Sequence, residues 1–219
     1  MYPPPDSALI CIAMTEEQTA PRQFEPLTAT YERLRHSTDA QELSEYARRP
    51  LPDKSQQAEF SRATALLEAV AGNPHTPLED RVFLARTMPF PNILVKLSQD
   101  GDVEVRRAVA ANEDDKNWLV GLLTKDDDPE VRSIALRNPR TSWKMRLEGA
   151  QNPLVDAETL DFLADLGTER ESGAPQVLSA MVRRAVALNP NTGADTLGRL
   201  ANDPAPEVVR AARRRLSTQ

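Results

Sequence analysis

One phrase that recurs along this chain of 219 residues constrains its fold more than any other feature. A Val-Arg pair begins the phrase, Ala-rich residues follow, and Asn or Asn-Pro ends it; clear copies occupy residues 105–112, 131–139 and 182–190. A short phrase repeated at regular intervals is typical of proteins built as a stack of small units, each of which contacts only its neighbours. The sequence therefore predicts a repeat protein and not a globule around one core.

The Asn that ends the phrase sets a register along the chain. Its position recurs at Asn73, Thr87, Asn112, Asn138, Asn152 and Asn189. The first and fourth members stand 65 residues apart, and so do the second and fifth. The third and sixth stand 77 residues apart, because a polar stretch with Gly and Pro at 167–176 is inserted as a loop. The register indicates a duplicated block of alternating short and long units.

Each unit is expected to hold short helices. Within the phrase, apolar residues recur with helical spacing, as at Val131, Ile134 and Ala135. The Asn then ends the helix, because Asn tolerates a left-handed backbone and a residue that precedes Pro leaves the α region. Leucines one turn apart, such as Leu160 and Leu163, predict a second helix in the long units.

The full phrase, Leu-x-x-Asp-x-(Asp/Pro)-x-Glu-Val-Arg-x-Ala-Val-Ala-x-Asn-Pro-x-Thr-Pro, resembles the repeat of the leucine-rich repeat variant family. Its closest copies are residues 97–112, 123–141 and 187–211. The resemblance implies an all-α fold, a right-handed α-solenoid of α/α or α/3₁₀ helix pairs, similar to HEAT and armadillo stacks. Some members of this family hold an iron–sulfur cluster through cysteines ahead of the repeats. This chain has only Cys11, so neither that cofactor nor any other is expected.

Three parts are expected along the chain. Residues 1–26, with a run of prolines near the start, are predicted to form a disordered tail. Residues 27–72 carry weaker copies of the pattern and are predicted to form a helical cap, because the end of a stack must cover its apolar face. The solenoid itself is predicted at 73–216. Met14 is an alternative start to Met1, since ordinary polar residues follow it.

Charge and composition limit the class of partner. The net charge is −6 and the isoelectric point is near 5.1, so the average surface repels nucleic acid and anionic membranes. The charge is uneven, with an acidic stretch at 100–130 and a basic one at 199–219. No apolar run approaches the roughly 18 residues of a membrane span. Together with the single cysteine, this predicts a cytoplasmic protein without a membrane partner.

Nothing in the sequence indicates catalysis or a metal site. His36 and His75 are the only histidines, and each falls in a predicted connection between helices. No HExxH pattern, no cysteine ligand set and no glycine-rich phosphate loop is present. We therefore expect a protein that is not an enzyme and that binds no metal.

A recurrent arginine stands six residues before most members of the register. We call Arg81, Arg106, Arg132, Arg146 and Arg183 the ladder arginines. In a regular stack they would align along one face, as a basic stripe for phosphate or acidic peptide. We favour the alternative that these arginines join one repeat to the next. Asp100 and Asp126 precede two of them by six residues, and the resemblance to HEAT-type stacks implies that such Arg–Asp pairs link neighbouring repeats. A guanidinium can also satisfy carbonyls at helix ends.

Positions that vary between copies are the candidates for contact with a partner. They are Glu113, Lys116, Trp118, Arg140, Trp143 and Lys144. The two tryptophans either form one aromatic anchor for a peptide or pack between repeats. The expected function is a scaffold whose concave surface binds another protein. A nucleic-acid-binding solenoid that uses the ladder arginines and the basic C-terminal helix is the alternative; the oligomeric state and the partner's identity stay open.

Overall fold

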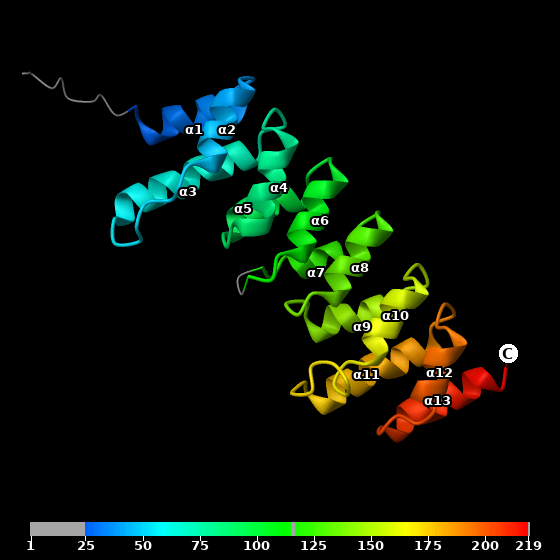
Figure 1. Ribbon diagram of the computed structural model, residues 1–219. Helices are drawn as coiled ribbons and strands as arrows, with labels where there is room; N and C mark the ends of the chain where they lie inside the picture. The colour runs from blue at the N-terminus through cyan, green and yellow to red at the C-terminus, as the bar shows by residue number, and fades with distance from the viewer. Residues whose placement is uncertain (1–24, 115–116, 219) are drawn as a thin grey trace, which may run out of the picture.

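The computed structural model describes residues 25–114 and 117–218, in which the chain forms thirteen α-helices and no strand (Figure 1). The helices are α1 (Leu27–His36), α2 (Ala40–Arg48), α3 (Gln57–Ala71), α4 (Leu78–Thr87), α5 (Pro91–Ser98), α6 (Val103–Ala111), α7 (Val120–Leu123), α8 (Pro129–Arg137), α9 (Trp143–Gln151), α10 (Ala157–Ala164), α11 (Gln176–Leu188), α12 (Ala194–Leu200) and α13 (Pro206–Leu216). The predicted all-α repeat solenoid is confirmed.

The helices alternate between two rows (Figure 1). Even-numbered helices follow one another along one row, and odd-numbered helices follow one another along the other. Most helices pack against a neighbour in sequence and against the next helix of their own row, as α6 does with α5 and α7 and with α4 and α8. The apolar core between the rows consists of Leu, Val, Ala and Ile side chains, small enough for the helices to approach closely. This is the packing of a stack of repeats.

The core falls into two clusters that meet inside α8. The first cluster ends at Ala135 and the second begins at Leu136. The position lies next to a change of row: the recurrent arginines of the register lie on the even-numbered α4, α6 and α8, and then on the odd-numbered α9 and α11. The duplicated block explains the change, since it holds five helices, α3–α7 and then α8–α12. Because five is odd, every helix of the second block lies on the row opposite to its counterpart.

Polar side chains define where the helices begin and end. Asp102 and Asp128 accept hydrogen bonds from backbone N–H groups in the first turns of α6 and α8. Asn112 and Asn138 follow the last turns of these helices with φ of −73° and −66°. Their backbone is extended, so the predicted left-handed conformation at this position is wrong. The extended backbone directs the Asn side chain toward the neighbouring helix of the row.

The register Asn is a buried link between successive helices of a row. Nδ2 of Asn138 donates to the carbonyl oxygens of Ala110 and Asn112 at 2.7 and 3.1 Å, at the end of α6. Asn73, Asn112 and Asn189 make the same pair of bonds to the ends of α1, α4 and α9. Helix C-termini leave carbonyls without intrahelical partners, and the Asn amide satisfies two of them.

The predicted parts of the chain map onto the helices as follows. Residues 27–71 form α1–α3, ahead of the first register Asn. The stretch predicted as an inserted loop lies between α10 and α11 and extends to the first residue of α11. Gly167 in this loop has a φ of +77° and approaches the side chain of Ser179 so closely that a Cβ would collide with it. Cys11 and Met14 lie outside the described residues, as does most of the predicted tail.

Candidate interaction surface

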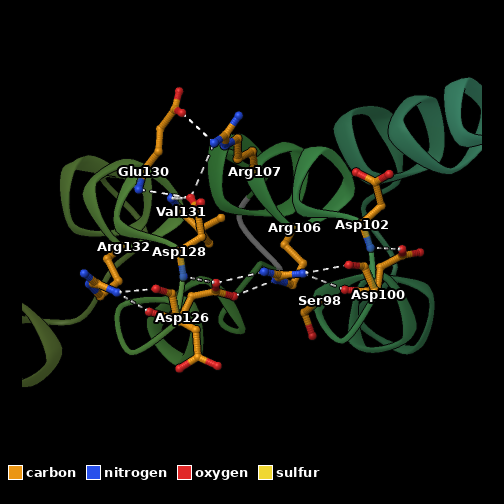
Figure 2. A network of polar contacts seen from close by, with 12 residues as sticks. Ser98, Asp100, Asp102, Arg106, Arg107, Asp126, Asp128, Glu130, Val131 and Arg132 are labelled. Atoms are coloured by element: carbon orange, nitrogen blue, oxygen red, sulfur yellow. Dashed lines mark hydrogen bonds and ion pairs between the residues drawn. The ribbon is translucent and has the colours of Figure 1, made fainter.

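The ladder arginines connect successive helices of a row (Figure 2). Arg106 on α6 donates from Nε and Nη2 to the carboxylate of Asp126 at 2.8 and 3.1 Å, and from Nη1 to the carbonyl oxygen of Asp100 at 2.9 Å. The carbonyl oxygen of Asp126 accepts in turn from Nη1 of Arg132 on α8, at 2.7 Å. Asp126 therefore contacts the arginines of two consecutive even-numbered helices. Its hydrogen bond raises the pKa of Arg106 above the usual value.

The carboxylate partner of a ladder arginine comes later in the chain, and not six residues earlier. The pairs are Arg81 with Asp100, Arg106 with Asp126, Arg146 with Glu171, and Arg183 with Asp203. The connection that precedes each helix lies beside the arginine of the previous helix in the row, so its carboxylate faces that arginine. The aspartate six residues before Arg106 or Arg132 contributes its backbone carbonyl to that arginine instead.

The ladder arginines form two sets on opposite rows, and two of the five are buried. Those of α4, α6 and α8 belong to the even row, and those of α9 and α11 to the odd row. The side chains of Arg183 and Asp203 are 4% and 3% exposed, and that of Arg146 is 1% exposed. Cations this buried and paired are not free to bind phosphate. The geometry favours the structural interpretation of the ladder.

Arg132 is the member of the ladder without a carboxylate among the described residues. Its Nη1 donates to two backbone carbonyls, and its Nε is buried without a partner. The partner of Arg106 is Asp126, which comes 20 residues later in the chain. The residue 20 positions after Arg132 is Asn152, which has no carboxylate. Arg132 lies on α8, the last even-numbered helix with a ladder arginine before the ladder changes row.

Five of the six predicted contact residues lie in the described part of the chain, and Lys116 lies outside it. Arg140 donates from Nε to the carbonyl oxygen of Glu113 at 2.8 Å, which ties the α8–α9 turn to the α6–α7 connection. Lys144 is exposed on α9 and lies 4.0 Å from Glu148. These side chains surround the junction of the two blocks.

The two tryptophans differ in their surroundings. Trp118 lies just before α7 and is 65% exposed, and Leu122, one turn further on, is 57% exposed. Trp143 is half-buried against the second core cluster, and the guanidinium of Arg146 lies 4.9 Å from the centre of its ring. No contact between the two indole rings occurs among the described residues. Trp118 therefore has the exposure of a partner anchor, and Trp143 has that of a packing residue.

A second exposed apolar group lies on α11, and sequence reasoning missed it. Val177, Met181 and Leu188 are 74%, 45% and 45% exposed, and Arg184 lies among them on the same helix face. We call these four residues the α11 ridge. A groove of about 210 Å³ separates the ridge from α9, and one of about 450 Å³ separates it from α13. The sequence held a signal, because other residues of α11 already supply its buried face.

The exposed large apolar side chains gather on the odd row. Within the described ranges, eight of ten belong to odd-numbered helices or the turn before α7: Leu27, Trp118, Leu122, Val177, Leu178, Met181, Leu188 and Leu216. Leu154 lies in the α9–α10 connection, and Leu78 on α4 is the one on an even-numbered helix. Concentrations of exposed apolar surface mark interaction sites more often than isolated apolar residues do.

Over residues 25–114 and 117–218, no group of three or more His, Cys, Asp or Glu side chains is placed to hold a metal ion. No helix in the described ranges has both the length and the apolar character needed to cross a membrane.

Comparison with known proteins identifies one segment of the chain. The leucine rich repeat variant family model matches residues 180–205, from the middle of α11 through α12 to the connection before α13. This segment contains the third copy of the phrase and the ion pair of Arg183 with Asp203. The resemblance to that family is therefore confirmed over these residues, and the helical stack around them is compatible with a HEAT-like solenoid. No curated protein and no solved structure matches the chain.

Proposed function

We propose that this protein is a non-enzymatic scaffold that binds another protein through its row of odd-numbered helices. The observation that carries the proposal is the one-sided distribution of exposed apolar side chains. The match to the leucine rich repeat variant model supports it, because stacked repeats present an extended surface whose specificity lies in residues outside the repeated phrase.

Trp118 and Leu122 form the aromatic part of this surface. An exposed Trp beside an exposed Leu provides apolar area that a partner can bury, and Trp is enriched among the residues that dominate binding energy. The ion pair of Lys125 with Glu148, at 2.8 Å, lies near the end of α7 and supplies a polar rim. We propose that Trp118 and Leu122 contact the partner directly.

Nucleic-acid binding is the second candidate, because α13 carries cations without partners. Arg210, Arg213 and Arg214 make no ion pair among the described residues. The engaged ladder arginines and the net charge of −6 weigh against this candidate.

Affinity capture with matched variants tests the proposal. The native chain, a Trp118→Ser/Leu122→Ser variant and a Leu78→Ser control from the even row are used as baits in nuclease-treated lysate. We expect proteins retained by the native chain to be lost with the double variant and kept with the control. Circular dichroism verifies that all three baits are folded. Equal retention by all baits, or retention only before nuclease treatment, would contradict a protein-binding odd row.

A further inference from the structure

Two identical copies of Val-Arg-Arg-Ala-Val-Ala occur in the chain, at residues 105–110 in α6 and 182–187 in α11. The first arginine of each copy is a ladder arginine and binds an aspartate 20 residues later. The second arginine differs between the copies. Arg184 has no ion pair within the described residues. Arg107 is surrounded by carboxylates, at 3.5 Å from Asp128 and 2.7 Å from Glu130 (Figure 2). It also lies 2.7 Å from Glu104.

The residues around the two copies account for this difference. At the 77-residue spacing of the duplicated block, the counterparts of the three carboxylates are Met181, Ala205 and Glu207. Two carboxylates are thus replaced by apolar side chains, and Glu207 makes no ion pair among the described residues. The positive charge of Arg184 is left without a carboxylate partner within residues 25–114 and 117–218, and it stands beside the exposed Met181.

The grooves on both sides of the α11 ridge combine apolar walls with positive charge. Met181, Arg184 and Leu188 line both of them. The groove toward α13 adds Arg210 and Arg214, and Glu207 is its one acidic side chain. Three guanidinium groups against one carboxylate give this groove a positive charge in a protein whose net charge is negative. Charged side chains without partners beside exposed apolar ones suit a ligand that supplies both carboxylates and apolar groups.

We propose that the α11 ridge and the α11–α13 groove dock a short acidic amphipathic segment of a partner protein. The apolar side chains of the segment pack on Met181 and Leu188, and its carboxylates pair with Arg184, Arg210 and Arg214. Arg184 thereby obtains from a partner the kind of carboxylate contact that Arg107 obtains within the chain. This inference rests on the proposed function and assigns a partner chemistry to one part of the odd row.

Nucleic acid fits the groove less well than an acidic segment does. Phosphate backbones match the arginines, but they leave Val177, Met181 and Leu188 exposed, and the groove has no aromatic side chain on which a base can stack. A second copy of the chain, through its acidic residues 100–130, is the remaining rival. The experiment below distinguishes these occupants.

Peptide display on the full chain tests the inference. A random peptide library is selected on the native chain and counter-selected against Met181→Glu, which restores on α11 the acidic residue that α6 has three positions before its second arginine. Leu78→Glu on α4 is the control, because it makes the same charge change at a similarly exposed position on the other row. Both positions are exposed, so the urea midpoints of both variants are expected to match that of the native chain.

We expect the selected peptides to carry Asp or Glu beside Leu, Met or Phe, and to bind Met181→Glu at least about tenfold more weakly than the native chain. Leu78→Glu is expected to bind within about twofold of native, and raising the salt concentration is expected to weaken binding. Selected peptides without acidic residues, or equal weakening by the two variants, would overturn the inference. So would displacement of the peptides by an oligonucleotide, or dimerisation of the native chain that Met181→Glu abolishes.

The test separates this inference from the proposed function. Peptides that bind Met181→Glu normally but fail on Trp118→Ser/Leu122→Ser would overturn the acidic site and leave the scaffold proposal intact. A library that yields no peptide for any surface of the chain would count against both.

Discussion

Helices α6 and α11 contain the same six residues, yet they build different surfaces. In both helices the first arginine is drawn into the stack by an aspartate of the following connection. The second arginine of α6, Arg107, lies among carboxylates. The second arginine of α11, Arg184, has no ion pair in the described part of the chain and lies beside apolar side chains. The repeated phrase therefore determines how a helix joins the stack. Residues outside the phrase determine whether its outer face is closed or open to a partner.

Helices α6 and α11 also differ in the row on which they lie. Because each block holds five helices, α6 lies on the even row and α11 on the odd row. The outer positions of the phrase thus point to opposite sides of the stack in the two copies. A duplication of an odd number of helices lets one sequence pattern supply both faces of a solenoid.

The largest expected effect concerns the first arginine of the phrase, which pairs with an aspartate in both copies. Arg183→Ala is expected to lower the free energy of unfolding by about 3–5 kcal/mol, because it leaves the buried carboxylate of Asp203 without its partner. Arg106→Ala is expected to cost less, since its pair is more exposed. Urea denaturation of both variants measures the difference. A loss below about 0.5 kcal/mol for Arg183→Ala would show that this ladder arginine contributes little to stability.

A second test changes the register Asn at the block junction. Asn138→Asp is expected to lower the free energy of unfolding by about 3 kcal/mol, because a carboxylate oxygen would replace the amide that donates to the carbonyls of Ala110 and Asn112. The site is 4% exposed, so water cannot relieve the repulsion. Thermal and urea unfolding measure the loss. An unchanged midpoint would show that this link contributes nothing.

The same substitution one unit later is expected to have the opposite sign. Asn152→Asp supplies the carboxylate that Arg132 lacks and is expected to raise the free energy of unfolding by about 1 kcal/mol. Oδ1 of Asn152 accepts the N–H of Leu154 at 2.9 Å, a bond that an aspartate keeps. The gain should vanish in an Arg132→Ala background. A gain that persists there, or a destabilisation, would exclude the ion pair as its cause.

A further test removes a carboxylate that stands beside Arg107 of α6 and has no counterpart beside Arg184 of α11. A hydrogen bond from the N–H of Val131, with help from the charge of Arg107, lowers the pKa of Asp128. Position 205, which matches position 128 in the other copy, holds Ala. The Asp128→Ala variant is expected to lower the free energy of unfolding by about 1 kcal/mol near neutral pH.

The pH dependence of that loss follows from the lowered pKa. A lowered pKa in the folded state means that the contribution of Asp128 is complete above the unfolded value near 3.9 and is lost as pH falls through the folded value. The difference in the free energy of unfolding between the native chain and Asp128→Ala should therefore shrink as the pH falls from about 5 toward 2. A constant difference across this range would show that the carboxylate charge is not responsible.

Much of the fold was predictable from local spacing, whereas the contacts between helices were not. The helices follow from apolar positions such as Val131, Ile134 and Ala135, which local geometry places on one face. The pairing of Arg106 with Asp126 depends on which connection lies beside which helix in a row, and sequence spacing alone suggested the aspartate six residues earlier. The change of row is likewise a property of the stack, because it requires a count of helices that include the four-residue α7.

The exposed surface was the least predictable part. Variation between copies singled out Trp118, which is exposed, but also Trp143, which packs against the core. Met181 and Leu188 went unnoticed because apolar residues on an amphipathic helix are ordinarily assigned to its buried face. The packing of α11 against both row neighbours shows that Val182 and Val186 fill that face and leave the ridge outside.

The central claim is that Arg107 helps to hold the stack together and that Arg184 does not. Urea denaturation of Arg107→Ala and Arg184→Ala, measured side by side, tests it most directly. Arg107→Ala is expected to lower the free energy of unfolding by about 1 kcal/mol, because it dissolves a network of three carboxylates between α6 and α8. Arg184→Ala is expected to change it by less than about 0.5 kcal/mol. Equal losses, or a larger loss for Arg184→Ala, would contradict the account, because Arg184 would then hold the stack together and not stand free for a partner.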